Sequence, residues 1–128
     1  FLGPSQWEAV ANHSNDHGPS IQQVSESFRR QGHAQVDYPM AQAYGAGLVA
    51  QACLEQAGTL DDQALRETAG TLDFSTFFGK FKIEPETGRQ IGHSALIVQW
   101  QQGRKVILWP PEHSQASLVY PWPGRALR

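Results

Sequence analysis

Residues 12–17, with the sequence NHSNDH, gather side chains that can bind a metal ion. If this segment were helical, His13 and His17 would share one face, and Asp16 could join them as a zinc ligand. The surrounding Asn, Ser, Gly and Pro residues favour a loop instead, which removes that spacing. We therefore interpret residues 8–19 as a polar surface loop, and we expect neither a metal ion nor another cofactor.

Nucleophiles and phosphate-binding loops lack the spacing that catalysis requires. The sequence has no G-x-S-x-G elbow that would expose a serine nucleophile. The glycines of Gly45-Ala46-Gly47 fall inside a predicted helix rather than between a strand and a helix, so they do not form a phosphate loop. Glu84 and Glu86 flank a proline in a predicted turn, where we interpret them as solvated rather than as an acid–base pair. We expect a protein that is not an enzyme.

Aromatic residues are the better candidates for ligand contact. Trp7 follows a predicted strand end, and ligands of open α/β sheets bind in the crevice beyond the strand ends. Trp7 is therefore a candidate pocket wall, with Gln6 as its polar neighbour. Tyr38 precedes a predicted helix, whose N-terminus is a natural place to receive a carboxylate. The alternative is that both rings only pack in the core, which is the commoner role of partly buried aromatic residues.

Helices are predicted on both sides of these residues. Ser20 is a suitable N-cap for the first helix, and Gly58 is suited to end the second. The second helix is rich in Ala and Gly, and two glycines within one turn indicate close packing against a neighbouring element. The predicted helices cover residues 20–31, residues 39–57, and a shorter stretch that starts at Asp61 or Asp62.

Residues 72–110 predict a β-meander with two turns. Phe81 and Ile83 alternate with lysines, so one face is apolar and the other is solvated. The chain is expected to turn at residues 84–88 and again at 102–103. The predicted strands lie before the first turn, at residues 94–101 and at residues 106–109. A further strand is expected to end at Phe1-Leu2, stopped by Gly3-Pro4, and residues 110–128 form a predicted extended, proline-rich tail.

Size and composition indicate one domain. The chain has 128 residues, of which 40% are hydrophobic, and a formal net charge of −2. It has no obvious basic face, which argues against nucleic-acid binding. Cys53 is the only cysteine and is interpreted as a small buried residue. The chain starts on Phe1, without Met and without a signal peptide, so we expect it to be a piece of a longer protein.

These segments, in this order, resemble one family of transport proteins. The matching stretches are LGPSQWE, the run from DYPMAQAYGAG to GRQIGH, and SALIVQWQQGRKVILWPP. They are similar to the type I periplasmic solute-binding proteins of ABC transporters, in particular the branched-chain amino-acid and amide group. The resemblance implies an α/β fold in which residues 1–128 are a single partial domain. This domain would be the carboxy-terminal fragment of a two-lobe protein, with helices and a β-meander.

The resemblance also implies a role for the candidate site. In this family a solute lies between two lobes that close by hinge motion. Trp7 and Tyr38 are the positions to which ligand binding carries over. Pro39 stands where some relatives have an aromatic residue, so stacking at that position is not implied.

The function expected from the resemblance is that of a non-enzymatic solute receptor. It would serve an ABC importer of amino acids or amides, in the periplasm, with a membrane permease as its partner. A ligand-sensing regulatory or receptor domain of the same fold is the second interpretation, and a self-standing α+β interaction module is the third. Cutting a parallel sheet leaves an unpaired edge, so we expect the chain either to be a proteolytic remnant or to self-associate through that exposed strand edge.

Overall fold

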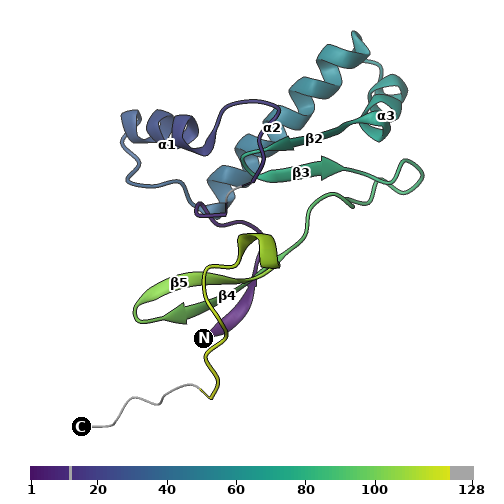
Figure 1. The fold of residues 1–128 in the computed structure, drawn as a ribbon. Coiled ribbons are helices and arrows are strands. Elements are labelled where there is room, and N and C mark those ends of the chain that lie inside the picture. The colour runs from purple at the N-terminus through teal and green to yellow at the C-terminus, as the bar shows by residue number, and fades with distance from the viewer. Residues whose placement is uncertain (12, 122–128) are drawn as a thin grey trace. The chain divides into compact units, whose positions relative to one another are not determined.

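The structure, a computed structural model, describes residues 1–11 and 13–121. The chain divides into two compact units, which we call the central unit (Trp7–Ser94) and the terminal unit (Phe1–Gln6 with Ala95–Arg128). Each is described by itself. The elements, labelled in Figure 1, are β1 (Leu2–Ser5), α1 (Ile21–Arg30), α2 (Tyr38–Ala57), α3 (Asp62–Thr71), β2 (Asp73–Thr76), β3 (Gly79–Lys82), β4 (Leu96–Gln101), β5 (Arg104–Trp109) and the 3-10 helix η1 (Pro111–His113).

The predicted mixture of helices and strands is confirmed, whereas the predicted single meander is wrong. β3 pairs antiparallel with β2, and β4 lies between β1 and β5 in a second antiparallel sheet. The turn at residues 84–88 exists but does not join two neighbouring strands of one sheet. A period-two pattern identifies a strand and its buried face, and it does not identify the partner of that strand.

The helix boundaries follow from capping side chains. Ser20 accepts a hydrogen bond from the backbone N–H of Gln23, and the Gln23 side chain accepts one from the Ser20 N–H, which completes a capping box. Asp37 and Asp61 cap α2 and α3 through their carboxylates. Gly58 ends α2 in the left-handed conformation, with φ of 64°.

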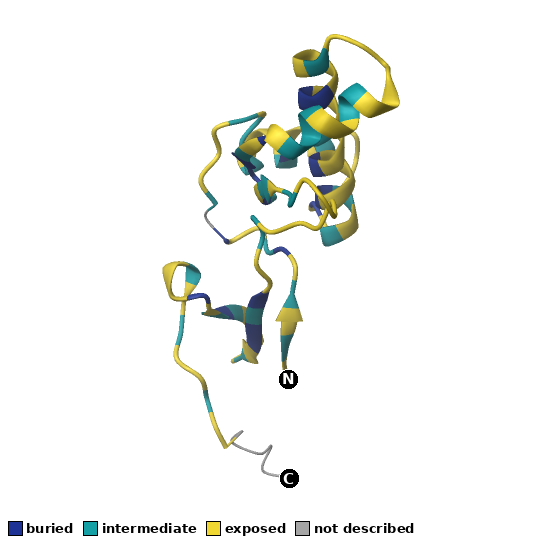
Figure 2. Ribbon diagram, turned by 90° about the vertical axis from the view of Figure 1, so that its right-hand side faces the viewer, coloured by how far each residue is buried: buried dark blue, intermediate teal, exposed yellow. Residues whose placement is uncertain are grey.

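Two apolar clusters form the core of the central unit (Figure 2). The larger cluster lies among α1, α2 and the β2–β3 hairpin. The smaller cluster joins the second half of α2 to α3 and to β2 and β3. The buried members of the larger cluster are Trp7, Val24, Val36, Ala41, Leu48 and Phe77. Those of the smaller cluster are Ala52, Cys53 and Leu72.

Neighbouring segments occupy both outer edges of the β2–β3 hairpin. On the β2 side, the backbone N–H groups of Asp16 and His17 donate to the carbonyl of Ser75, and the Asp16 carboxylate accepts from the Ser75 N–H at 2.7 Å. On the β3 side, the Gln90 side chain accepts from the Lys82 N–H, and the Ile91 N–H donates to the Lys82 carbonyl. Covered edges cannot pair with a further strand.

The acid stability of this hairpin depends on one carboxylate. The ammonium groups of Lys80 and Lys82 each lie 2.8 Å from an oxygen of Asp73. Their hydrogen bonds, with Lys80 first and Lys82 second, lower the pKa of Asp73. A lowered pKa stabilises the fold above the ordinary pKa of 3.8, and the contribution is lost as pH falls from that value through the lower one.

We therefore expect the Asp73 carboxyl signal, followed by NMR, to titrate below the ordinary Asp value. In Asp73→Asn the acid limb of the stability curve should flatten, because residue 73 then no longer gains a proton as the pH falls. A normal titration of Asp73 would contradict the contacts with the two lysines.

Glutamine side chains fasten the terminal unit. Gln99, which is buried within β4, accepts from the Val119 N–H and donates to the Val119 carbonyl, each at 3.0 Å. Gln101 donates to the Ser117 carbonyl at 2.8 Å. Gln115 binds Ile107 of β5 through both its side chain and its backbone N–H. The described part of the tail therefore lies along the sheet, and residues 122–128 of the predicted tail are outside the described residues.

The expected strand stop at Gly3-Pro4 is wrong, because β1 continues to Ser5 and pairs with β4 along its whole length. Pro4 is tolerated because β1 is an end strand of its sheet, where a missing N–H does not interrupt the ladder. The predicted turn at Gln102-Gly103 is confirmed. That residues 1–128 form a single partial domain of a larger protein stays a prediction.

Candidate functional site

Trp7 is a core residue of the central unit, with 4% of its surface exposed. Its indole Nε1 donates a hydrogen bond to the carbonyl of Phe77 at 3.2 Å. Its ring meets Phe77 edge-on and stacks on Phe78, with ring centroids 6.4 Å apart and planes 8° apart. In the structure Trp7 therefore packs against Phe78 in the core. Direct contact of Trp7 with a ligand stays a prediction.

Tyr38 reaches the same ring from another element. It is the first residue of α2, is half-buried, and has its ring centroid 6.2 Å from that of Phe78. The two candidate residues thus approach Phe78 from segments far apart in the sequence. We call the set Trp7, Tyr38, Phe78 and His93 the aromatic cluster.

The sequence analysis missed Phe78, the centre of this cluster. Phe78 lies in the turn between β2 and β3, where its N–H donates to the hydroxyl of Thr76 at 3.2 Å. The imidazole of His93 stacks on it, with centroids 5.4 Å apart and planes 17° apart. The sequence signal for this role was the pair of phenylalanines directly before Gly79. A large apolar side chain in a turn does not belong to the buried face of a strand, so it is available to contact another segment.

Glycines permit the close approach that the cluster requires. A Cβ atom on Gly45 would lie 3.2 Å from the Cβ of Phe78, so the absence of a side chain lets α2 pack against this ring. This confirms the prediction of close packing at one of the two neighbouring glycines. Gly47 has no atom within 4 Å of such a position, so at this residue the prediction is wrong.

The N-terminus of α2 already carries a carboxylate. Asp37 accepts a hydrogen bond from the Met40 N–H at 3.0 Å and places its negative charge at the positive end of the helix. A ligand carboxylate at this helix end would be repelled by the negative charge of Asp37. The aromatic faces of Tyr38 and Phe78, which are both half-buried, are therefore the stronger part of the candidate site.

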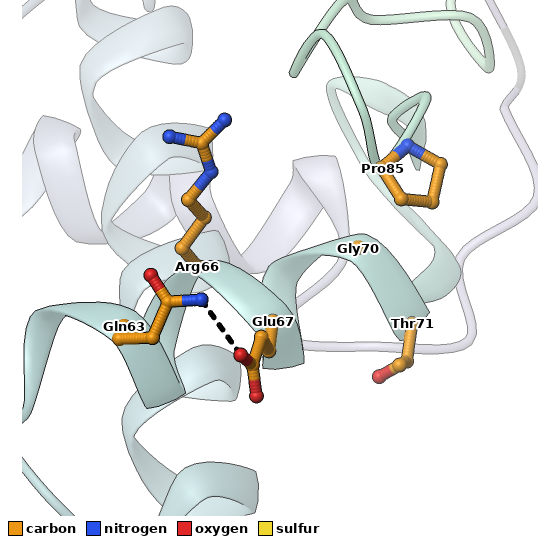
Figure 3. A pocket seen from close by; sticks show the side chains of 6 residues that line it. All are labelled: Gln63, Arg66, Glu67, Gly70, Thr71 and Pro85. Atoms are coloured by element: carbon orange, nitrogen blue, oxygen red, sulfur yellow. Dashed lines mark hydrogen bonds between the residues drawn. The ribbon is translucent and has the colours of Figure 1, made fainter.

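Three hollows elsewhere on the central unit have volumes of about 290, 250 and 370 Å³. Neither Trp7 nor Tyr38 lines any of these three. Figure 3 shows the first, beside α3, where Gln63 donates to Glu67 at 2.7 Å and the Arg66 side chain points away from this pair. Polar groups that do not converge on one point give a small ligand little orientation.

The two histidines of the polar loop contact different rings. His17 lies against Phe74, with centroids 4.6 Å apart, and His13 lies 6.1 Å from His93. The segment is a loop, as predicted, while Asn12 is outside the described residues. Within residues 1–11 and 13–121 no three His, Cys, Asp or Glu side chains are grouped closely enough to hold a metal ion.

Cys53 is buried in α2, as predicted, and burial raises the pKa of its thiol. A raised pKa disfavours the reactive thiolate. In the part of the chain that the structure describes, no helix combines the length and the apolar character needed to cross a bilayer.

A family model described as periplasmic binding protein matches residues 5–105. This range includes every member of the aromatic cluster, α1 to α3 and the hairpin that carries Phe78. A comparison with curated proteins found no match.

Proposed function

We propose, because this chain belongs to the periplasmic binding protein family, that it is part of the solute-binding component of an ABC importer. The family suggests binding of a small solute outside the cytoplasm. We take the solute to be an amino acid, an amide or a related small molecule. The observation that carries this proposal is the meeting of Trp7 and Tyr38 on the ring of Phe78.

The aromatic cluster suits the apolar part of such a solute. Tyr38 and Phe78 are half-buried, so part of each side chain remains accessible, and the Tyr38 hydroxyl adds one polar group. Trp7 and His93 both stack on the Phe78 ring and thereby restrict its orientation. Pockets of this kind combine apolar walls with a few placed polar groups.

We further propose that the protein is not an enzyme. Glu84, the first of two candidate carboxylates, accepts a hydrogen bond from Thr87 at 2.6 Å and faces Arg89 across its own turn. Ser75 donates its backbone N–H to the Asp16 carboxylate at the edge of β2. These groups stabilise turns and strand edges, which supports a binding role.

The chain would be the carboxy-terminal portion of a two-lobe receptor that delivers its solute to a membrane permease. We propose that the expected self-association uses β1, an end strand of its sheet. Other segments bond to the outer edges of β2 and β3, and Gln115 bonds to β5 at Ile107. Pro4 leaves the β1 edge one donor short, so we propose a weak two-fold pairing.

A ligand-sensing receptor domain of the same fold, or a stand-alone interaction module, is the alternative. The full gene and its neighbours on the genome distinguish the transport receptor from these two alternatives. An export signal on the parent and an adjacent permease gene favour transport, whereas an adjacent regulator gene favours sensing. An initiator codon directly before Phe1 would favour the stand-alone module.

The direct test is calorimetric titration of the full-length gene product with a panel of amino acids, amides and sugars. We expect binding of an amino acid or amide, and we expect Tyr38→Ala to weaken it at least about tenfold, the effect of losing roughly 1.4 kcal/mol. Tyr44→Ala, a tyrosine of the same helix outside the cluster, is the matched control and should bind normally. Selective binding of sugars, or equal loss in both variants, would contradict the proposal.

A further inference from the structure

The tip of the β4–β5 hairpin combines exposed aromatic and basic side chains. Gln102 and Gly103 both have positive φ, of 51° and 77°, as a two-residue hairpin turn requires. This turn fixes the register so that Trp100 lies opposite Lys105. Trp100 is 45% exposed although it occupies a strand position.

Apolar side chains continue from the tip onto both neighbouring segments. The Trp100 N–H donates to the Phe1 carbonyl at 3.1 Å, so Phe1, which is 78% exposed, lies beside Trp100. The bond from Gln101 to Ser117 brings Leu118, which is 56% exposed, to the same end of the sheet on the face opposite Trp100, because consecutive strand side chains point to opposite faces. We call Phe1, Trp100, Arg104, Lys105 and Leu118 the tip patch.

Charge distinguishes the terminal unit from the rest of the chain. Among its described residues the terminal unit has two basic side chains, Arg104 and Lys105, and one acidic side chain, Glu112. In the central unit acidic residues outnumber basic ones. The two basic side chains lie at the hairpin tip with exposed aromatic side chains, a combination that suits a partner that is both anionic and able to accept apolar groups.

We infer that the tip patch binds the surface of an anionic lipid bilayer. Tryptophan is enriched at membrane interfaces, and each Lys or Arg near an anionic surface strengthens attraction roughly fivefold. An acidic protein would be the other partner of this chemistry. A stable protein interface takes about 20–30 residues from each side, far more than a hairpin tip supplies, whereas a bilayer accepts a small patch.

The test is co-sedimentation of the 128-residue chain with vesicles of phosphatidylcholine alone and of phosphatidylcholine mixed with phosphatidylglycerol. We expect binding to the anionic vesicles only, with loss at high salt. The double charge reversal Arg104→Glu with Lys105→Glu should weaken binding at least about 25-fold. Trp100→Ser should weaken it severalfold, and the blue shift of tryptophan emission on binding should shrink.

Matched variants of the central unit serve as controls. Arg29→Glu with Arg66→Glu makes the same charge change at exposed helix positions, and Leu60→Ser removes an 80% exposed apolar side chain. After correction for the change in net charge of the protein, both control variants should bind vesicles with an affinity within about twofold of that of the original chain. No binding to anionic vesicles at low salt, or equal losses in tip and control variants, would overturn the inference. Solute binding by the aromatic cluster is not involved in this assay.

Discussion

Trp7→Ala is expected to lower the free energy of unfolding by about 3–5 kcal/mol, the usual loss when a large aromatic side chain is removed from a core. Trp7 is 4% exposed and contacts both Phe77 and Phe78. The substitution also removes the donor that binds the Phe77 carbonyl. Urea unfolding followed by circular dichroism measures the difference.

Two further variants separate the roles of Trp7. Trp7→Phe keeps an aromatic ring but loses the hydrogen bond, so we expect a smaller loss of about 1–3 kcal/mol. Trp100→Ala removes a tryptophan that is 45% exposed and should change stability by less than about 1 kcal/mol. If Trp7→Ala were as mild as Trp100→Ala, Trp7 would not be a core residue, and its interpretation as an accessible pocket wall would gain support.

Gly79→Ala has the second largest expected effect, about 2–4 kcal/mol of lost stability. Gly79 begins β3 with φ of 137°, a conformation that residues with a side chain adopt only at a cost of roughly 1–3 kcal/mol. A Cβ atom would also collide with Nδ1 of His93, the imidazole that stacks on Phe78. Because the collision displaces His93 from the aromatic cluster, solute affinity should fall together with stability.

Gly88→Ala is the matched control, because Gly88 also has positive φ, of 71°, but no atom within 4 Å of an added Cβ. It should lose only about 1 kcal/mol. In a double-mutant cycle, His93→Ala should relieve the collision part of the Gly79→Ala effect. Equal losses at Gly79 and Gly88, with no coupling to His93, would show that the imidazole does not press on this glycine.

The sequence predicted the helices well because their ends depend on neighbouring residues. Ser20, Asp61 and Gly58 determine boundaries through contacts within four residues. Strand pairing was predicted less well. The partner of β3 is β2 rather than β4, and β4 pairs not only with β5 but also with β1, which lies more than 90 residues away along the chain. Pairing over such distances depends on packing that no local pattern contains.

For the candidate site, too, single residues could be predicted from the sequence while long-range contacts could not. Trp7 and Tyr38 could each be selected from residue type and position, but their meeting point could not. Phe78 is brought to them by the β2–β3 turn and by the space that Gly45 leaves. Burial of Trp7 likewise depends on Phe77, which follows 70 positions later.

The proline in β1 limits how strongly this strand can add to another sheet. β1 is an end strand, and a strand added beside it would gain affinity from backbone hydrogen bonds. Pro4 interrupts the row of donors because it has no N–H. Pairing of this protein through β1 at high concentration should therefore be weak, and it should be a poor seed for the continuous strand ladders of fibrils.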